Sequence, residues 1–355
     1  MNARSGEAAT GRAITVLGPV PAADLGVTLV HEHVLMSLLV YWRAPAPDDA
    51  EAQAFATQPV SLENLWWVRQ HIMDNRDNCQ LDNLEHAIHE VRRFKAAGGG
   101  TLTEVTSANI GRDVRGLAEV SRRTNVHVIA GTGYYIAPSH PPELADRSVA
   151  SLTEEMTRDL LEGIGETGVR AGVIGEIGTS DPITDVEERV VRAAAQAQRR
   201  TGAPIVVHPA PGKHSVRRLA TLLEGCGADP TRVVISHLDE RMRDDVPSLL
   251  ALARRGFVLG YDTFGREAYY ASRDTQLPSD ADRIQVLMRL LEAGYAGSVG
   301  LAQDICFKTE LTAYGGHGYA HLLRHIVPRL RLAGVTPSDL DTMLITTPRR
   351  LLAWA

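Results

Sequence analysis

The sequence predicts a (β/α)8 barrel, the fold in which eight parallel strands are each followed by a helix. Three observations indicate this fold class. Short β-branched runs recur along the chain, there are eight of them in 355 residues, and amphipathic helical patterns separate them. An open doubly wound sheet is the alternative, but no GxGxxG sequence follows the first strand, so its dinucleotide-binding form has little support.

The elements follow one another in strict alternation. The strands are expected at Val27–His31, Thr101–Val105, Val126–Ala130, Gly172–Glu176, Pro204–His208, Arg232–His237, Gly256–Tyr261 and Ser298–Ala302. The helices are expected from Leu81 to just before Gly98, at Gly116–Arg123, Leu152–Glu166, Val186–Thr201, Ser215–Gly225, Pro247–Arg255, Ala281–Ala293, Tyr319–Leu332 and Pro337–Leu344.

Residues 1–355 are predicted to form one domain with three long additions. Residues 36–80 follow the first strand and include a short helix near Ser61 that carries Trp66 and Trp67, which we expect to pack on the barrel. This apolar insertion could also form a homodimer interface. Residues 262–280 and 305–318 are expected to cover the face of the barrel where such folds place their active sites.

Composition restricts the partners and the compartment. The formal net charge of −6 argues against nucleic acid or an anionic membrane surface as the main partner, and favours a small-molecule substrate. Cys79, Cys226 and Cys306 form no CxxC pair, which favours a reducing compartment. The N-terminal residues lack the apolar core of a signal peptide, and no apolar run is long enough to cross a bilayer. The chain is therefore predicted to be cytoplasmic.

The most informative motif is His31-Glu32-His33, at the end of the first predicted strand. Side chains alternate along a strand, so His31 and His33 should point the same way while Glu32 points away from them. Two imidazoles on one face make half of a metal site. Alone, the pair is better explained as an accidental surface feature.

Other potential ligands end other strands. Glu176 ends the fourth predicted strand, His208 the fifth, His237 the sixth and Asp304 the eighth. A single histidine there could be a satisfied buried residue, and a single carboxylate could cap the next helix. Because the carboxyl ends of barrel strands meet at one mouth, six such residues together predict a metal centre.

In these residues and in several further segments, the chain resembles the phosphotriesterase-related branch of the amidohydrolase superfamily. The resemblance runs from His31 to Arg350. It rests on an ordered set of segments: Gly111-Arg112-Asp113, Gly131-Thr132-Gly133-Tyr134-Tyr135, Gly175-Glu176, Ser236-His237-Leu238-Asp239, Asp262-Thr263-Phe264-Gly265 and Tyr314-Gly315-Gly316-His317-Gly318.

The resemblance implies two divalent metal ions at the mouth of the barrel. His31, His33 and Asp304 would bind the more buried ion, His208 and His237 the more exposed one, and Glu176 would bridge both. The founding phosphotriesterases use a carboxylated lysine as the bridge, so Glu176 places the chain in the Glu-bridged subgroup. Mixed nitrogen and oxygen ligands suit zinc, the expected metal, and also manganese, cobalt or iron.

The resemblance further implies a metal-dependent hydrolase that attacks a carboxylic ester or lactone with a metal-bridging hydroxide. Asp304 is the expected catalytic residue, since it can accept a proton and pass it to the leaving group. Small N-acyl amides rank second as substrates. Phosphotriesters rank third, as promiscuous substrates, because Glu176 replaces the lysine bridge.

Four further residues belong to the predicted mouth. Tyr135 matches the position where lactonase-like relatives place a tyrosine near the substrate oxygen, and rim packing is an equal alternative. Arg266, Arg273 and Lys308 lie in loops over the mouth and could bind an anionic group, although a solvated charge is the simpler expectation for each alone.

Two other classes of function remain open. A non-catalytic barrel could keep the site to bind a metal or ligand, although an intact set of six ligands argues against this. An aldolase or isomerase barrel commonly depends on a lysine at a strand end, and no predicted strand here ends in one.

Overall fold

Eight parallel strands form one continuous sheet in the computed structural model, which describes residues 11–270 and 274–354. In chain order the strands are β3 (Val27–Glu32), β6 (Gly99–Glu104), β7 (His127–Thr132), β8 (Val173–Gly178), β9 (Ile205–His208), β10 (Val233–Ile235), β11 (Val258–Tyr261) and β14 (Val299–Leu301). Each pairs with the next along the chain. The first and last strands also meet, because the Gly300 backbone packs against the Val30 side chain. The predicted (β/α)8 barrel is confirmed.

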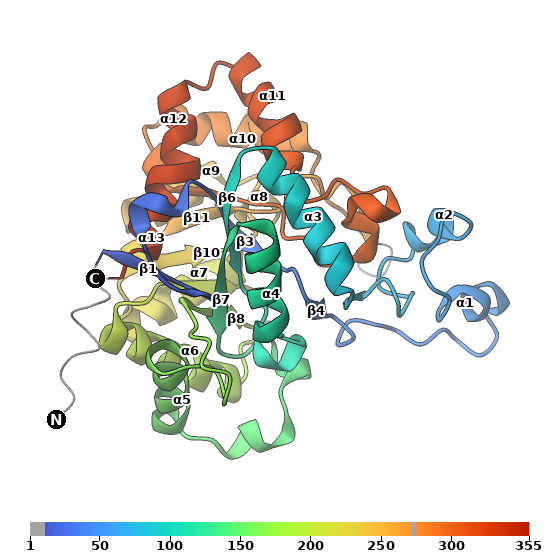
Figure 1. Cartoon of the computed structure of the whole chain (residues 1–355), viewed down its shortest axis with the longest axis horizontal. Coiled ribbons are helices and arrows are strands. Elements are labelled where there is room, and N and C mark those ends of the chain that lie inside the picture. Colours follow the sequence, from blue (N-terminus) through green and yellow to red (C-terminus); the bar gives the residue numbers. More distant parts are fainter. Residues whose placement is uncertain (1–10, 271–273, 355) are drawn as a thin grey trace.

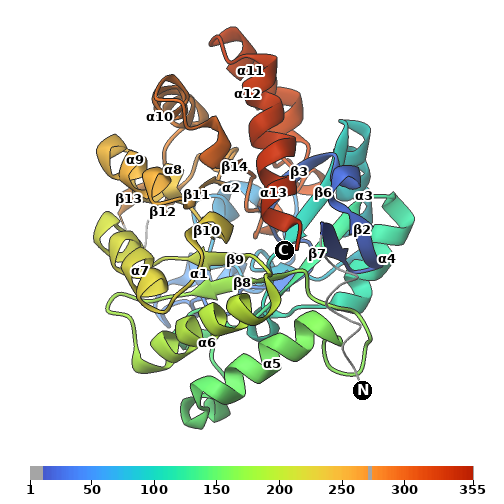
Figure 2. The same ribbon diagram turned by 90° about the vertical axis from the view of Figure 1, so that its left-hand side faces the viewer.

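Helices surround the sheet on its outer side (Figure 2). They are α3 (Leu84–Ala96), α4 (Val114–Thr124), α5 (Val149–Leu161), α6 (Asp185–Thr201), α7 (Lys213–Gly225), α8 (Leu238–Arg241), α9 (Val246–Arg254), α10 (Asp280–Glu292), α11 (Val327–Leu332), α12 (Pro337–Asp341) and α13 (Thr347–Leu352). Side chains that cap the first turn fix where these helices begin. Thr184 accepts a hydrogen bond from Glu187 N in a capping box at the start of α6, and Ser279 does the same with Asp282 N at α10.

Alternate strand residues fill the barrel interior. Val206, Val234 and Val258 belong to one apolar cluster, which also contains Ala13 and Leu351. Ala13 comes from a hairpin that the sequence did not predict, formed by β1 (Arg12–Thr15) and β2 (Gly18–Pro21). The hairpin and α13 thus close the end of the barrel opposite the predicted mouth (Figure 2). Because side chains alternate, His208 points into the barrel like Val206, two residues earlier.

The insertion after β3 projects from the barrel (Figure 1). Its ends are joined by the antiparallel pair β4 (Met36–Ser37) and β5 (Gln80–Leu81), and it contains α1 (Ala50–Phe55) and α2 (Leu65–Val68). Both tryptophans lie on α2, which begins four residues later than Ser61. The expected packing is wrong for Trp66, which is 58% exposed. Trp67 is buried and stacks on His71 at 4.2 Å, in an apolar cluster of the insertion that also packs against Tyr314 of the loop 305–318.

The two predicted mouth loops are present. Residues 262–280 contain the short pair β12 (Tyr269–Tyr270) and β13 (Thr275–Gln276); Arg273 lies outside the described residues. In the loop 305–318, Lys308 is not a solvated charge but is buried, with its Nζ 2.6 Å from Asp77 and 3.2 Å from Asp82. Lys308 therefore ties this loop to the insertion. No helix in the described part of the chain is long and apolar enough to span a bilayer.

Candidate active site

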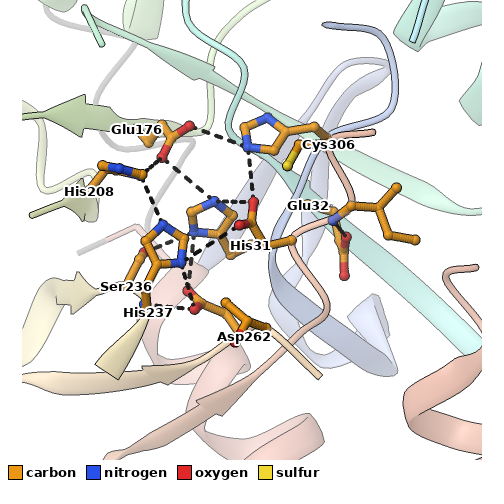
Figure 3. Close-up of polar contacts among 12 residues, drawn as sticks. His31, Glu32, Glu176, His208, Ser236, His237, Asp262 and Cys306 are labelled. Carbon is orange, nitrogen blue, oxygen red and sulfur yellow. Dashed lines mark hydrogen bonds and ion pairs between the residues drawn. The ribbon is translucent and has the colours of Figure 1, made fainter. Parts of the chain in front are cut away.

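The six predicted ligands lie together at the carboxyl ends of the strands. Figure 3 labels His31, Glu176, His208 and His237 among them. On the inner side, the Nε2 atoms of His31 and His33 each lie 3.3 Å from Asp304 Oδ1. These three residues are buried, and their donor atoms are close enough to hold one ion. Glu176 lies beside them, with Oε1 3.3 Å from His33 Nε2. The His31-Glu32-His33 motif thus directs both histidines to the same side, as the alternation of strand side chains predicted.

The outer side of the cluster consists of His208 and His237, with Glu176 between the two sides. His208 Nδ1 lies 3.1 Å from Glu176 Oε2 and 2.9 Å from His237 Nε2. His237 also lies with His31 and Glu176 in a second group whose donor atoms could share an ion. One Glu176 oxygen faces each side, which is the arrangement that a bridging carboxylate requires.

Hydrogen bonds at the far side of each ring orient the histidines. His31 Nδ1 lies 2.8 Å from Ser236 Oγ, and His33 Nδ1 lies 2.8 Å from Thr106 Oγ1. Asp262 accepts from the backbone N–H of His237 at 2.7 Å and lies 3.0 Å from His237 Nδ1. A proton on each Nδ1 leaves the Nε2 lone pair directed at the centre, which is the common way that proteins prepare imidazole ligands.

Asp262 was missed as a site residue, although it immediately follows the seventh predicted strand. Its side chain is fully buried and contacts both His237 and His31, the latter at 3.2 Å. The same strand-end rule that selected the six ligands would have selected it.

As predicted, Glu32 points away from the centre (Figure 3). It has a role there that the sequence did not reveal. It is fully buried and accepts hydrogen bonds from the backbone N–H groups of Gln303, at 2.8 Å, and Ile305, at 3.1 Å. Asp304, between them, has a φ of 52°, an unusual conformation for a residue with a side chain. Glu32 therefore fixes the backbone on both sides of Asp304 and joins β3 to the end of β14.

The site favours the protonation states that metal ligands need. Burial and the positive charge of Arg241 lower the pKa of His208 to about 3, so this imidazole is neutral. Burial alone would raise the pKa of Glu176, but hydrogen bonds with His208 and His33 outweigh it and hold the pKa below its usual value. For Asp304, burial is likewise outweighed, chiefly by the charge of Arg266, and its pKa lies well below the usual value.

Arg266 differs from the expectation of a solvated or anion-binding loop charge, because protein carboxylates already bind its guanidinium. Its Nη1 donates to Asp304 Oδ2 at 2.8 Å and its Nε donates to Glu310 Oε1 at 2.7 Å. It also donates to the Asp304 carbonyl and lies close to Cys306. Two carboxylates thus neutralise this buried guanidinium, which holds the outer oxygen of Asp304 in place.

A pocket opens over the cluster, whose residues form part of its lining. Tyr135 lines it, as predicted, with its hydroxyl 3.3 Å from His208 Nε2 and 2.9 Å from the Tyr41 hydroxyl. The insertion contributes Tyr41 and Met73 to the same wall. The insertion is therefore part of the pocket and not only an outlying segment.

The residues present fit two divalent ions. Four imidazoles and two carboxylates suit borderline metals such as zinc. The buried His31 Nε2 has no hydrogen-bond partner within the described ranges, although it is directed at two carboxylates. An ion that takes up this lone pair would remove the cost of leaving it unpaired.

Comparison with known proteins agrees with this geometry. The profile of the phosphotriesterase family matches residues 11–352. The chain belongs to the phosphotriesterase family. Members of this family are hydrolases that depend on two metal ions, so the resemblance seen in the sequence and the predicted enzyme class are confirmed. The individual ligand assignments stay predictions.

Three similar family members cover nearly the whole chain. The N-acetyltaurine hydrolase of Salmo salar is 37% identical, over 98% of this chain and 99% of its own length. The N-acetyltaurine hydrolase of Bos taurus is 38% identical, over 97% and 99%. The crystal structure of a resiniferatoxin-binding protein from Rhodobacter sphaeroides is 38% identical, has a TM-score of 0.93 and covers 96% of this chain and 95% of that chain.

Proposed function

We propose that this phosphotriesterase-family hydrolase cleaves the amide bond of a small N-acyl compound at a centre of two zinc ions. The observation that carries the proposal is the end-to-end similarity to N-acetyltaurine hydrolases. The six converging donors and the small adjoining pocket support it. Amides therefore move ahead of the esters and lactones that the sequence placed first, and lactone cleavage stays a prediction.

In this proposal His31, His33 and Asp304 would hold the inner ion, His208 and His237 would hold the outer ion, and the Glu176 carboxylate would serve both. When bound, the ions supply Lewis acidity, which activates water at neutral pH and polarises the acyl carbonyl. The protein contributes the orientation of the donors, through Asp262, Ser236 and Thr106, and their neutral or anionic state.

Asp304 is the catalytic residue that moves the proton. Hydrolysis adds water across the amide: a C–O bond forms, the C–N bond breaks, and the products are a carboxylic acid and an amine. The nitrogen must gain a proton to leave, because an amide anion is a very poor leaving group. Asp304 is the carboxylate between the inner histidines and the pocket, so it can accept the proton of the attacking water and deliver it to nitrogen.

Tyr135 is the proposed substrate contact. Its hydroxyl lies at the pocket wall next to His208, where it can donate a hydrogen bond to the acyl oxygen. Burial, the first of several causes, raises the pKa of this phenol well above its usual value, so the hydroxyl keeps its proton.

A substrate panel tests the proposal. Zinc- and manganese-loaded protein is assayed with N-acetyltaurine, other N-acyl amino compounds, simple lactones, phosphorylated sugar lactones and a phosphotriester, with the Asp304→Asn variant as the control for contaminating activity. We expect the highest kcat/KM with an N-acyl compound, loss of activity with a chelator, and recovery with zinc. A lactone with a higher kcat/KM than every amide would overturn the proposal.

A further inference from the structure

Two guanidinium groups line the pocket, and their surroundings differ. Arg266 is neutralised by Asp304 and Glu310, as described above. Arg241, at the end of α8, takes part in none of the ion pairs found within residues 11–270 and 274–354. Glu240 also lines the pocket but is not within ion-pair distance of Arg241. Among the described residues, Arg241 is therefore the pocket guanidinium that no carboxylate pairs with.

The donor atoms of Arg241 are buried as well as unpaired. Its Nε and Nη1 are both inaccessible and have no hydrogen-bond partner among the described residues. A guanidinium is always charged, and burying its N–H groups without acceptors costs free energy. Such a group is expected to gain an oxyanion when the pocket is filled, because guanidinium and oxyanion geometries match.

The remaining contact of Arg241 does not compete with a ligand. Its Nη2 lies 3.2 Å from His208 Nε2. The other nitrogen of that ring, Nδ1, is the one that faces Glu176 and His237. When the Nδ1 lone pair serves a metal ion, the neutral ring carries its proton on Nε2, which then cannot accept a hydrogen bond from Arg241. Nη2 can then donate to a ligand instead.

We propose that Arg241 binds the anionic end of the substrate, a sulfonate or carboxylate, while the acyl carbonyl lies at the donor cluster. This inference rests on the proposed amide hydrolysis and adds the substrate class. The guanidinium and the donor cluster lie on opposite sides of the His208 ring. The anion and the scissile amide are therefore separated by only about two or three atoms. The expected substrates are short N-acyl amino acids and N-acyl aminosulfonates.

A matched series of probes tests this assignment. N-Acetyltaurine, N-acetyl-β-alanine and N-acetylethanolamine share the acyl group and the two-carbon spacer, and end in a sulfonate, a carboxylate and a neutral hydroxyl. Kinetics and calorimetric binding are measured on the metal-loaded wild type and on the Arg241→Gln and Arg241→Lys variants. Arg243→Gln is the matched control, because Arg243 lies two residues away, has a half-exposed side chain (41%) and pairs with Asp244.

We expect Arg241→Gln to lower kcat/KM for the two anionic probes by about 10- to 100-fold, mainly through KM, and to change the neutral probe less than about 3-fold. Arg241→Lys should recover part of the loss, and Arg243→Gln should behave as wild type. Metal content and the melting temperature should not change, which separates recognition from folding. The ratio of the two anionic probes distinguishes sulfonate from carboxylate as the preferred group.

The outcomes separate this inference from the proposed function. If all three probes are cleaved equally well by wild type, amide hydrolysis stands and the role of Arg241 is wrong. If the anionic probes bind without being cleaved, and Arg241→Gln abolishes that binding, Arg241 is confirmed as the anion site and amide hydrolysis is wrong. Wild-type protein that neither binds nor cleaves the anionic probes overturns both. An equal loss for neutral and anionic probes in Arg241→Gln assigns Arg241 a structural role instead.

Discussion

The inner and outer halves of the donor cluster differ in how tightly the protein holds them. The inner half, His31, His33 and Asp304, is enclosed by Ser236, Thr106 and Glu32, and the His31 side chain is 0% exposed. In the outer half the His208 side chain is 15% exposed and faces Tyr135, Arg241 and the pocket. Protein contacts fix the inner half and also His237, which is 2% exposed and contacts Asp262, whereas His208 is the donor of the outer half that faces the pocket.

Because of this difference, we expect the two halves of the donor cluster to have separate functions. Fixed donors hold an ion and a proton carrier in one geometry, which lowers the reorganisation needed during reaction. The less enclosed half is where substrate must approach, so affinity and selectivity should depend on the residues around His208. Variants of the inner half should therefore change kcat or metal content, and variants around His208 should change KM.

The largest expected effect tests the inner half. Asp304→Asn keeps the shape of the side chain and an oxygen but removes its ability to accept a proton. We expect kcat to fall by about 10³-fold while both ions stay bound. Steady-state kinetics together with metal analysis by mass spectrometry measure this. An unchanged kcat at full metal occupancy would exclude Asp304 as the proton carrier.

The next effect tests the outer half. His208→Ala should reduce the metal content from two ions to about one per chain, because the inner donors remain. We expect kcat/KM to fall by about 10²-fold, since losing one Lewis acid removes a few kcal/mol of transition-state stabilisation. Loss of both ions would show that the two halves do not bind independently.

The donors of both halves could be predicted from the sequence. His31 and His33 lie two residues apart in one strand, and parallel strand ends meet at one mouth, so six donors followed from local patterns. Their placement together needed only the strand order, which is the order of the chain.

Contacts between distant segments could not be predicted in this way. Glu32 holds the backbone beside Asp304, more than 270 residues away in sequence, and no local pattern indicates such a partner. Arg266 and Lys308 were expected as surface charges, because a single sequence does not show that Glu310 or Asp77 will lie beside them. Burial of a charge depends on its partner, so it becomes visible only in the structure.

A smaller effect on metal binding tests Asp262, the residue that contacts both halves of the donor cluster. Asp262 contacts His31 in the inner half and His237 in the outer half, so Asp262→Asn should weaken the binding of both ions by about 10- to 100-fold. Competition with a chromophoric chelator measures the affinities. Asp244→Asn, at a side chain 88% exposed, is the control. Weakening of a single ion would assign Asp262 to one half.

The smallest effect decides what Tyr135 does at the boundary between the cluster and the pocket. Tyr135→Phe removes the hydroxyl that lies 2.9 Å from Tyr41 and 3.3 Å from His208 but keeps the ring. If the hydroxyl donates to the acyl oxygen, kcat/KM should fall by about 3- to 10-fold, because one neutral hydrogen bond is lost. The melting temperature should hardly change. Tyr41→Phe is the matched control, because it leaves the Tyr135 hydroxyl in the pocket. If both variants lower the melting temperature equally and leave kcat/KM unchanged, the two tyrosines only pack against each other. Selectivity in the outer half would then depend on Arg241 and the metal ligands.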